Sequence, residues 1–581
     1  MGTLKKENTR QSIMKASETS FRNLLEGTKQ FQIPLFQRPY SWKKSDWETL
    51  WEDLMRLYNN EIEGSHFLGS IVTQALPGTA DSISPYLVID GQQRLITLTI
   101  ILLSLRFYLK EENAHGVKLA EELYECYLIN KFKSDNNYYK VLPTQDDQEV
   151  YKKIILDESI NDTLKSKMIF KAYDFFRERL KTKKSEAKID YGRYKNLLLE
   201  RIVFVNITSD DRDNPYLIFE SLNNKGQELT QADLVRNYIF MKLPHNERDT
   251  VYAQKWLPLE TSFKNIIPQE DKFANILTNS FWFYLRKDGE SVNQKDVYKA
   301  IRKHLDCSNI NIKDELEKII KFSYYYQRMA FSELEEEANL KKFFTYFNRL
   351  DFSTCHIFLL NVYNDYQEKR LCINDFVRIL NYLESYFVRR FFTDKPTKSL
   401  GKIFDNLYKE VTQTVKNKNL ATLADGLYQV LESYEGEKIW PSDDEFKQGI
   451  MTKSIYSKSS NDRVKLFLEI LESHQTQEIV NFTNLSIEHI MPQKLTSDWQ
   501  NTLGNSHAKI HKNLVHTLGN LTLTAYNSSL SNSSFDKKLK LFKDSNVYLN
   551  KYLCQLNTWN EEEIKNRANH LADLAIKVWP R

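Results

Sequence analysis

An apolar run from Leu95 to Leu109 constrains this fold more than any other feature of the sequence. A helix needs about 20 consecutive apolar residues to span a bilayer, and this shorter run also contains Arg106. A helix that is apolar on all sides must be buried. We therefore expect a core helix in a soluble protein without a membrane partner. The residues Met1 to Lys6 lack the apolar segment of a signal peptide, which agrees with this expectation.

The length and composition predict several domains in a reducing compartment. The 581 residues exceed what one hydrophobic core supports, so we expect two domains, or three with a helical one between. Lys and Arg (81) nearly balance Asp and Glu (77), so the net charge of +4 gives no global argument for nucleic acid. The five cysteines form no C-x-x-C pair, which argues against disulfides and thiolate zinc and favours the cytoplasm.

The segment before the apolar run predicts a site for an anion. Two β-branched runs, His66 to Thr73 and Tyr86 to Asp90, are expected to be strands, and we expect them to be neighbours in one sheet. Gly91 follows, and Gln92, Gln93 and Arg94 then open the apolar helix. Backbone N–H groups and an arginine at a helix N-terminus suit a phosphate.

Upstream of these strands lie a loop and an amphipathic helix. Pro34 and Pro39 exclude a helix from the segment Phe31 to Trp42, which we expect to be an ordered loop. Apolar residues then recur from Trp47 to Leu57 at helical spacing.

Residues from about 110 to 430 are expected to be mostly helical, with aromatic and aliphatic side chains packed in the core. One strand is predicted there, from Arg201 to Ile207. Thr230 is a candidate N-cap with Asp233 three residues on, so Asp233 has a structural explanation. Asn223 and Arg236, with Lys225, remain candidates for binding.

The C-terminal region contains a second constellation of polar residues. Loop signals between Leu431 and Ser460 suggest a boundary, followed by a helix from Arg463 to Ser473 and a strand from Phe482 to Ile490. The predicted strand contains Glu488 and His489, whose side chains would point apart unless the chain bends locally. The run Leu518 to Leu523 is expected to be a glycine-kinked loop that enters a second strand.

These residue types suit phosphodiester hydrolysis. His489 can deprotonate water near neutral pH, and Glu488 is a hard oxygen ligand for Mg²⁺. Asn520 could fix the loop that presents His489, and Asn527 could be a second metal ligand. The alternative is a satisfied polar network in a non-catalytic domain.

A basic helix is expected to follow, with Ser533 as its N-cap. Its lysines could steer phosphate or could form an ordinary solvated face. Lys537 is assigned to the catalytic set with His489 and Asn520, whereas Lys538, Lys512 and His516 are assigned to DNA contact. His507 and His511 lack a third ligand, so no zinc site is expected there.

These motifs together resemble the GmrSD family of modification-dependent restriction enzymes and relatives such as SspE-type phage-defence nucleases. The run Glu488 to Pro492, with Leu518 to Leu523 and Asn527, is similar to the GmrD-type HNH nuclease and its ββα-metal fold. The resemblance implies that His489 is the general base, that Glu488 and Asn527 bind metal, and that Asn520 is the middle residue of HNH.

The N-terminal motifs resemble GmrS-type domains, which have a ParB/sulfiredoxin-like fold and hydrolyse nucleoside triphosphates. Arginines would neutralise phosphates and glutamines would bridge phosphate, ribose or base. A salt bridge between Arg94 and Asp90, and core packing of Tyr40 and Trp42, are the structural alternatives. The expected nucleotide-binding set is Gln37, Arg38, Tyr40, Trp42, His66, Asp90, Gly91, Gln92, Gln93, Arg94, Asn223 and Arg236.

The sequence thus predicts a predominantly helical α+β protein. We expect a ParB/sulfiredoxin-like nucleotide-binding core over residues 1–110, a helical region over 111–430 that includes the strand-turn-helix motif of 201–240, and an HNH domain over 431–581. The expected function is nucleotide-regulated cleavage of modified phage DNA with Mg²⁺ and GTP or another nucleoside triphosphate, and a homo-oligomer is a candidate assembly. The alternative is a non-cutting DNA-binding or nucleotide-sensing defence protein with a degenerate HNH fold.

Overall fold

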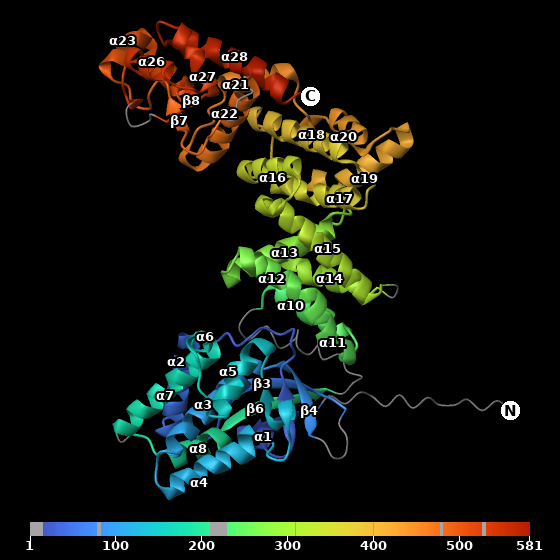
Figure 1. The fold of residues 1–581 in the computed structure, drawn as a ribbon, viewed down its shortest axis with the longest axis vertical. Helices are drawn as coiled ribbons and strands as arrows, with labels where there is room; N and C mark the ends of the chain where they lie inside the picture. The colour runs from blue at the N-terminus through green and yellow to red at the C-terminus, as the bar shows by residue number, and fades with distance from the viewer. Residues whose placement is uncertain are drawn as a thin grey trace, which may run out of the picture. The chain divides into compact units, whose positions relative to one another are not determined.

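The computed structural model describes residues 15–77, 83–186, 188–209, 229–307, 310–398, 400–476, 480–525 and 530–581 (Figure 1). It is mostly helical with a mixed sheet, which confirms the α+β class. Two compact units are present: one extends to Thr261 and includes Leu305–Lys313, and the other comprises Ser262–His304 and Asp314–Arg581. The three-part division at residues 110 and 430, and the ParB/sulfiredoxin-like and ββα-metal assignments, remain predictions.

The first unit is built on a six-stranded sheet in the order β1-β6-β3-β4-β2-β5. The predicted neighbours β3 (His66–Ala75) and β4 (Ser84–Asp90) pair antiparallel, and the predicted strand β6 (Ile202–Ser209) runs parallel to β3. The segment expected to be a loop from Phe31 begins instead inside a strand, because β2 pairs with both β4 and β5. The remaining strands are β1 (Lys15–Ser20), β2 (Lys29–Gln32) and β5 (Val141–Leu142).

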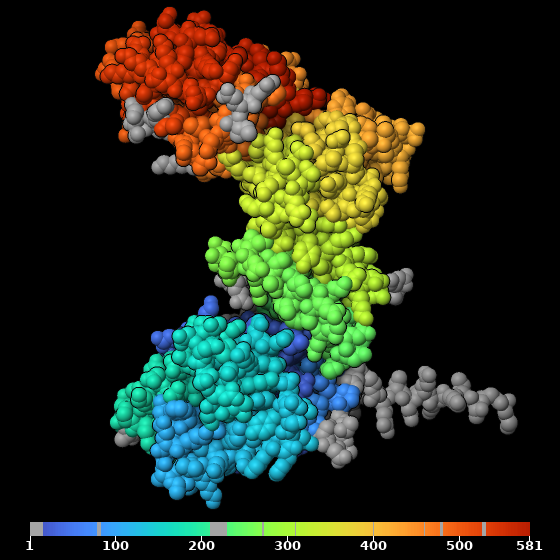
Figure 2. Space-filling view, viewed as in Figure 1, coloured from blue at the N-terminus to red at the C-terminus, as the bar shows by residue number. Residues whose placement is uncertain are grey.

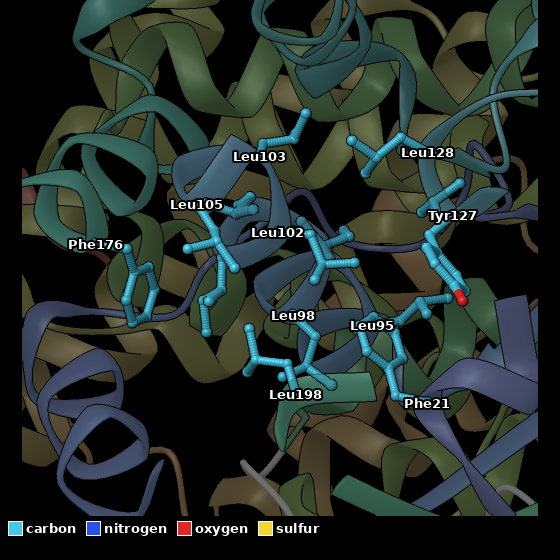
Figure 3. Close-up of a cluster of buried hydrophobic side chains, with 14 of the residues drawn as sticks. Phe21, Leu95, Leu98, Leu102, Leu103, Leu105, Tyr127, Leu128, Phe176 and Leu198 are labelled. Carbon is cyan, nitrogen blue, oxygen red and sulfur yellow. The ribbon is translucent and has the colours of Figure 1, made fainter. Parts of the chain in front are cut away.

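The apolar run forms the core helix of this unit, α3 (Gln92–Leu109). Figure 3 shows Leu95, Leu98 and Leu102 among side chains contributed by other elements, including Phe21 and Tyr127. Within the described ranges, no helix combines the length and hydropathy needed to cross a membrane. The other helices are α1 (Phe21–Leu25), α2 (Lys44–Tyr58), α4 (Ala114–Leu123), α5 (Gln145–Ile155), α6 (Asp162–Lys165), α7 (Met168–Ser185), α8 (Tyr191–Glu200), α10 (Gln231–Lys242), α11 (His245–Val251) and α12 (Leu257–Ile266), whose C-terminal half belongs to the second unit.

The predicted cap at the start of α10 is confirmed. The Thr230 hydroxyl accepts a hydrogen bond from the backbone N–H of Asp233 (3.2 Å), and the Asp233 carboxylate accepts one from the backbone N–H of Thr230 (3.3 Å). Such reciprocal bonds satisfy two donors that a helix N-terminus would otherwise leave unpaired. Asp233 therefore has the structural role that its spacing indicates.

The second unit begins with helices that pack through aromatic side chains, as expected for the middle of the chain. Phe387 stacks on Phe352 with ring centroids 4.2 Å apart and on Phe404 at 5.4 Å. Burial of such large rings is a major stabilising contribution. The helices are α13 (Glu270–Arg286), α14 (Val297–Leu305), α15 (Ile312–Ala330), α16 (Ala338–Leu350), α17 (His356–Gln367), α18 (Ile373–Phe392), α19 (Leu400–Lys418), α20 (Leu423–Glu432) and α21 (Asp443–Thr452).

The C-terminal part of this unit surrounds a small antiparallel sheet of β7 (Ser486–His489) and β8 (Leu521–Thr524). Its atoms are the orange-to-red spheres of Figure 2. The strand expected from Phe482 to Ile490 is shorter than predicted, because pairing with β8 covers only four residues. Its helices are α22 (Asn461–Gln475), α23 (Ser497–Leu503), α24 (His507–Leu514), α26 (Phe535–Lys543), α27 (Tyr548–Lys551) and α28 (Glu561–Val578).

The expected N-cap Ser533 is wrong by one residue. The cap of α26 is Ser534, and no side-chain hydrogen bond is formed there. The carbonyl of Ser533 instead accepts a hydrogen bond from the indole of Trp499 (3.0 Å), so a tertiary contact fixes this residue outside the helix.

The last residues of the chain are bound to α18. The indole of Trp579 donates to the Glu384 carboxylate (2.8 Å), and Arg389 Nε donates to the Trp579 carbonyl (2.8 Å). The Ser385 hydroxyl donates to the carbonyl of Pro580 (2.7 Å). These contacts join the C-terminal helix α28 to the aromatic helices within one unit.

The buried carboxyl of Glu384 makes the stability of this contact pH-dependent. Burial raises its pKa to about 7, and the hydrogen bond from Trp579 opposes the shift. Burial therefore favours the protonated form of Glu384 in the folded state. Because the folded pKa lies above the ordinary value of 4.5, the contribution of the protonated carboxyl to folding stability is complete below pH 4.5 and is lost as pH rises through about 7. Between pH 5 and pH 8 the wild type should therefore lose roughly 2–3 kcal/mol of unfolding free energy relative to Glu384→Gln.

Urea unfolding of both proteins at the two pH values measures this difference. The exposed carboxylate Glu435 offers a matched control, since Glu435→Gln keeps Glu384 and should lose as much unfolding free energy between the two pH values as the wild type does. An equal stability difference between wild type and Glu384→Gln at pH 5 and pH 8 would contradict the assignment.

Candidate active site

His489 lies at the end of β7 and is only 6% exposed. Its Nε2 lies 3.1 Å from Nδ1 of His516, and the Gln493 amide nitrogen lies 3.4 Å from its Nδ1. The ring of Tyr456 packs against it edge to face, with centroids 4.5 Å apart. The imidazole is therefore held on three sides in one orientation.

This environment keeps His489 neutral at physiological pH. Burial, followed by the nearby His516, Lys538 and His511, lowers its pKa to about 3. A neutral imidazole carries one ring proton and one lone pair, so it can accept a proton from a reacting group.

Glu488 contacts a different element from its neighbour. The ammonium of Lys538, in α26, donates to the Glu488 carboxylate and also to the His489 carbonyl (2.7 Å). Burial raises the pKa of Glu488 and lowers that of Lys538, and the charge of each partner opposes the shift of the other. Glu488 and His489 both pair regularly with β8, so the bend expected from the sequence is not found within β7.

Asn520 fixes the loop that follows His489. Its side-chain oxygen accepts from the Met491 N–H (2.8 Å) and from the Trp559 indole (3.0 Å). Its amide nitrogen donates to the carbonyls of Met491 and Val515, each at 2.9 Å. The side chain is fully buried, so these bonds replace water and hold three segments together.

Helix α28 packs against the segment that contains Asn520 and bonds to its backbone. The Arg567 guanidinium donates to the carbonyls of Gly519 and Leu521, each at 2.8 Å, on either side of Asn520. The helix approaches so closely that a Cβ at Gly519 would lie 2.7 Å from the Ile564 carbonyl oxygen. Arg567 and Trp559 were not predicted from the sequence, because no local spacing connects either of them with Asn520.

The predicted metal ligands can be placed only in part. Asn527 lies outside the described residues. Among the residues that are described, no group of three or more His, Cys, Asp or Glu side chains could hold a metal ion. Mg²⁺ usually keeps several waters and is held by one or two carboxylates with substrate phosphates. The single carboxylate Glu488 fits a site of that kind.

The basic residues assigned to the site differ in exposure. Lys512 and Lys537 are exposed, and His516 is partly buried beside His489. Lys538, expected to contact DNA, is 0% exposed, so in this conformation it is not available to DNA. A signal for this burial existed in the sequence, because Lys538 lies three residues after Phe535 and four before Phe542, on the apolar face of α26.

In the first unit, Asp90 and Arg94 meet where β4 passes into α3. Arg94 Nη2 donates to the Asp90 carboxylate (3.1 Å) and to the carbonyl of Ser70 (2.8 Å). The helix begins after Gly91, whose φ of +90° favours glycine and where an added Cβ would lie 2.9 Å from the Ser70 carbonyl oxygen. The salt bridge considered as an alternative is thus present, although both side chains stay partly exposed.

Several residues of the expected nucleotide set make internal contacts. Gln37 donates to the carbonyls of Val88 and Ile89, and Gln93 accepts from the Ser41 N–H (2.8 Å). The hydroxyl of Tyr40 is bonded within the core to Thr97 (2.7 Å) and to the Trp47 indole (2.8 Å). Arg38, Trp42 and Gln92 are partly exposed, as Asp90 and Arg94 are.

Of three further residues in that set, two make contacts with other side chains and the third cannot be placed. Arg236 is buried between Glu260 (2.5 Å) and Asp233 (2.6 Å). His66 begins β3, with its ring 3.9 Å from Asp53, whereas Val72 is the β3 residue that pairs with Asp90. Asn223 lies outside the described residues. The structure therefore joins Gln37 to the strand that ends at Asp90, whereas the guanidinium of Arg236 is taken up by its two carboxylate partners.

Two comparisons with protein families match the regions that contain these sites. Residues 21–240 match the N-terminal domain of the GmrSD restriction endonuclease, and residues 440–574 match the C-terminal domain of GmrSD restriction endonucleases. A comparison with curated proteins finds no match. The first match contains the Asp90–Arg94 junction, and the second contains the whole His489 site.

The close approach of α28 to Gly519 can be tested by substitution. Gly519→Ala should lower the unfolding free energy by about 1–3 kcal/mol, because a backbone oxygen cannot move aside as a side chain can. Chemical denaturation of the full chain measures the effect.

Gly401→Ala is the matched control. Gly401 lies in the first turn of α19, and its added methyl group would meet only the end of the Arg286 side chain, at 3.3 Å. Alanine is also the better helix former, so this variant should be neutral or slightly stabilised. Equal destabilisation of both variants would count against the proposed contact.

Proposed function

Because the chain belongs to the GmrSD-like family of restriction endonucleases, we propose that it is a phage-defence DNA endonuclease of the HNH type. The observation that carries the proposal is a buried, neutral His489 held beside the carboxylate-bearing residue Glu488. Cutting would depend on a DNA modification and on a nucleoside triphosphate bound by the first unit. The protein would act in the cytoplasm and could assemble as a homo-oligomer.

His489 acts as the general base. The Gln493 amide donates to Nδ1, which leaves the ring proton on Nε2, where it is shared with Nδ1 of His516. A proton from the attacking water therefore enters at Nδ1. Rotation of the Gln493 amide then presents its oxygen to the new N–H and stabilises the imidazolium. Asn520 keeps the loop in register with His489 during this step.

Glu488 would hold the divalent metal, with Asn527 as the second protein ligand. When bound, Mg²⁺ would neutralise charge on the scissile phosphate and the leaving oxygen. The exposed Lys537 is placed in the catalytic set as a phosphate contact, and Lys512 and His516 are placed on the DNA-facing side. Such contacts would bind DNA through its backbone and would not select a sequence.

The Asp90–Arg94 junction would bind the nucleoside triphosphate, GTP or another. The start of α3 offers backbone N–H groups, and Arg94 offers a guanidinium that is only partly neutralised by Asp90. Gln92 and Arg38 are the partly accessible neighbours that could reach phosphate or ribose.

A second candidate is a DNA-binding or nucleotide-sensing protein that does not cut. The Lys538–Glu488 ion pair favours this candidate, because it engages the carboxylate that a metal would need. The intact family matches at both ends favour the endonuclease.

Cleavage of DNA by the full chain tests the site. With Mg²⁺, a nucleoside triphosphate and modified phage DNA, His489→Ala should cut at least about 100-fold more slowly than wild type, because the base is lost. His507→Ala is the control, since His507 lies on α24 and its Nδ1 bonds to the nearby Gly504 carbonyl (3.1 Å). Undiminished cleavage by His489→Ala would refute the base assignment.

Phosphate release tests the nucleotide site separately. Arg94→Met should reduce hydrolysis of the nucleoside triphosphate by at least about tenfold, since a charge-assisted contact to phosphate is lost. Arg56→Met, on the exposed face of α2, should leave hydrolysis unchanged. Equal rates in wild type and Arg94→Met would place the nucleotide elsewhere.

A further inference from the structure

Lys538 is a fully buried cation at the site, although its neighbour Lys537 faces solvent. Its ammonium reaches from α26 to the Glu488 carboxylate and to the His489 carbonyl (2.7 Å). Lysine is almost never fully buried unless it is paired. The Lys538 ammonium thus occupies the position next to the Glu488 carboxylate.

We propose that Lys538 competes with the divalent metal for Glu488, so that the ion pair and the bound metal exclude one another. The inference rests on the proposed function, in which Glu488 is a metal ligand. Two cations on one carboxylate repel strongly where water is scarce, and Glu488 is only 7% exposed. Metal binding therefore requires the Lys538 ammonium to leave the carboxylate.

The competition has two consequences. The apparent metal affinity of the protein is reduced, because part of the binding free energy is spent on separating the ion pair. Departure of Lys538 also releases the His489 carbonyl, so α26 loses its polar contact with the end of β7 when the metal enters. Lys538 thus prevents cations of low affinity from binding to Glu488.

Titration of the full chain with MnCl2 alone, without DNA or nucleotide, tests the competition by calorimetry. Lys538→Met should bind Mn²⁺ at least tenfold more tightly than wild type, because the competitor is gone and Glu488 is left unpaired. Mn²⁺ should also raise the Tm of Lys538→Met more than that of wild type, since the metal neutralises the buried carboxylate. Lys540→Met, an exposed lysine on the same helix, should match the wild-type affinity.

Glu488→Gln separates failure of this inference from failure of the proposed function. If Glu488→Gln abolishes Mn²⁺ binding while Lys538→Met binds no more tightly than wild type, the competition is refuted and the metal site stands. If Glu488→Gln binds Mn²⁺ like wild type, the metal does not use Glu488, and both the competition and the proposed metal site are refuted. Lys538→Gln keeps a hydrogen-bond donor without the charge, so it should also bind more tightly and replaces Lys538→Met if that variant does not fold.

Discussion

The C-terminal site depends on the hydrogen bonds of one buried carboxamide, that of Asn520. It joins the loop after β7, the residue Val515 that precedes β8, and the indole of Trp559 just before α28. A buried amide has to satisfy its donors and acceptors within the protein, so these segments can take only arrangements that keep all of its bonds. The position of His489 at the end of β7 follows from that constraint.

Burial also determines the charge state of the site. His489 is neutral because its surroundings disfavour an imidazolium, whereas Glu488 keeps a countercharge through Lys538. The same low exposure thus produces an imidazole able to accept a proton and a carboxylate whose charge is already balanced. The lone pair of the neutral imidazole is available, but its basicity is lowered by the positive groups around it, so the site becomes a stronger base when that positive charge is removed or offset.

The motif residues of the first unit stabilise the fold around the junction, in addition to any role in binding a ligand. Gln37 and Gln93 join the loop around Pro39 to β4 and α3, and Arg94 ties the start of α3 to β3 and β4. This use explains why the motif combines glycines, which permit close approach, with side chains that bond to backbone. Asp90 and Arg94 are only partly buried, so part of each charged side chain stays exposed to solvent.

The sequence by itself determined the local structure: the buried helix α3, the adjacent strands β3 and β4, and the cap formed by Thr230 and Asp233. These features depend on periodicity and on residues three or four positions apart, so neighbouring residues suffice to predict them. Only the tertiary structure decided the contacts of Trp579 with α18, of Tyr456 with His489 and of Arg567 with the loop around Asn520, because each joins segments far apart in the chain. Lys538 shows both parts: its spacing from Phe535 and Phe542 places it on the buried face of α26, but its partner Glu488 lies fifty residues earlier, and only folding brings the two charges together.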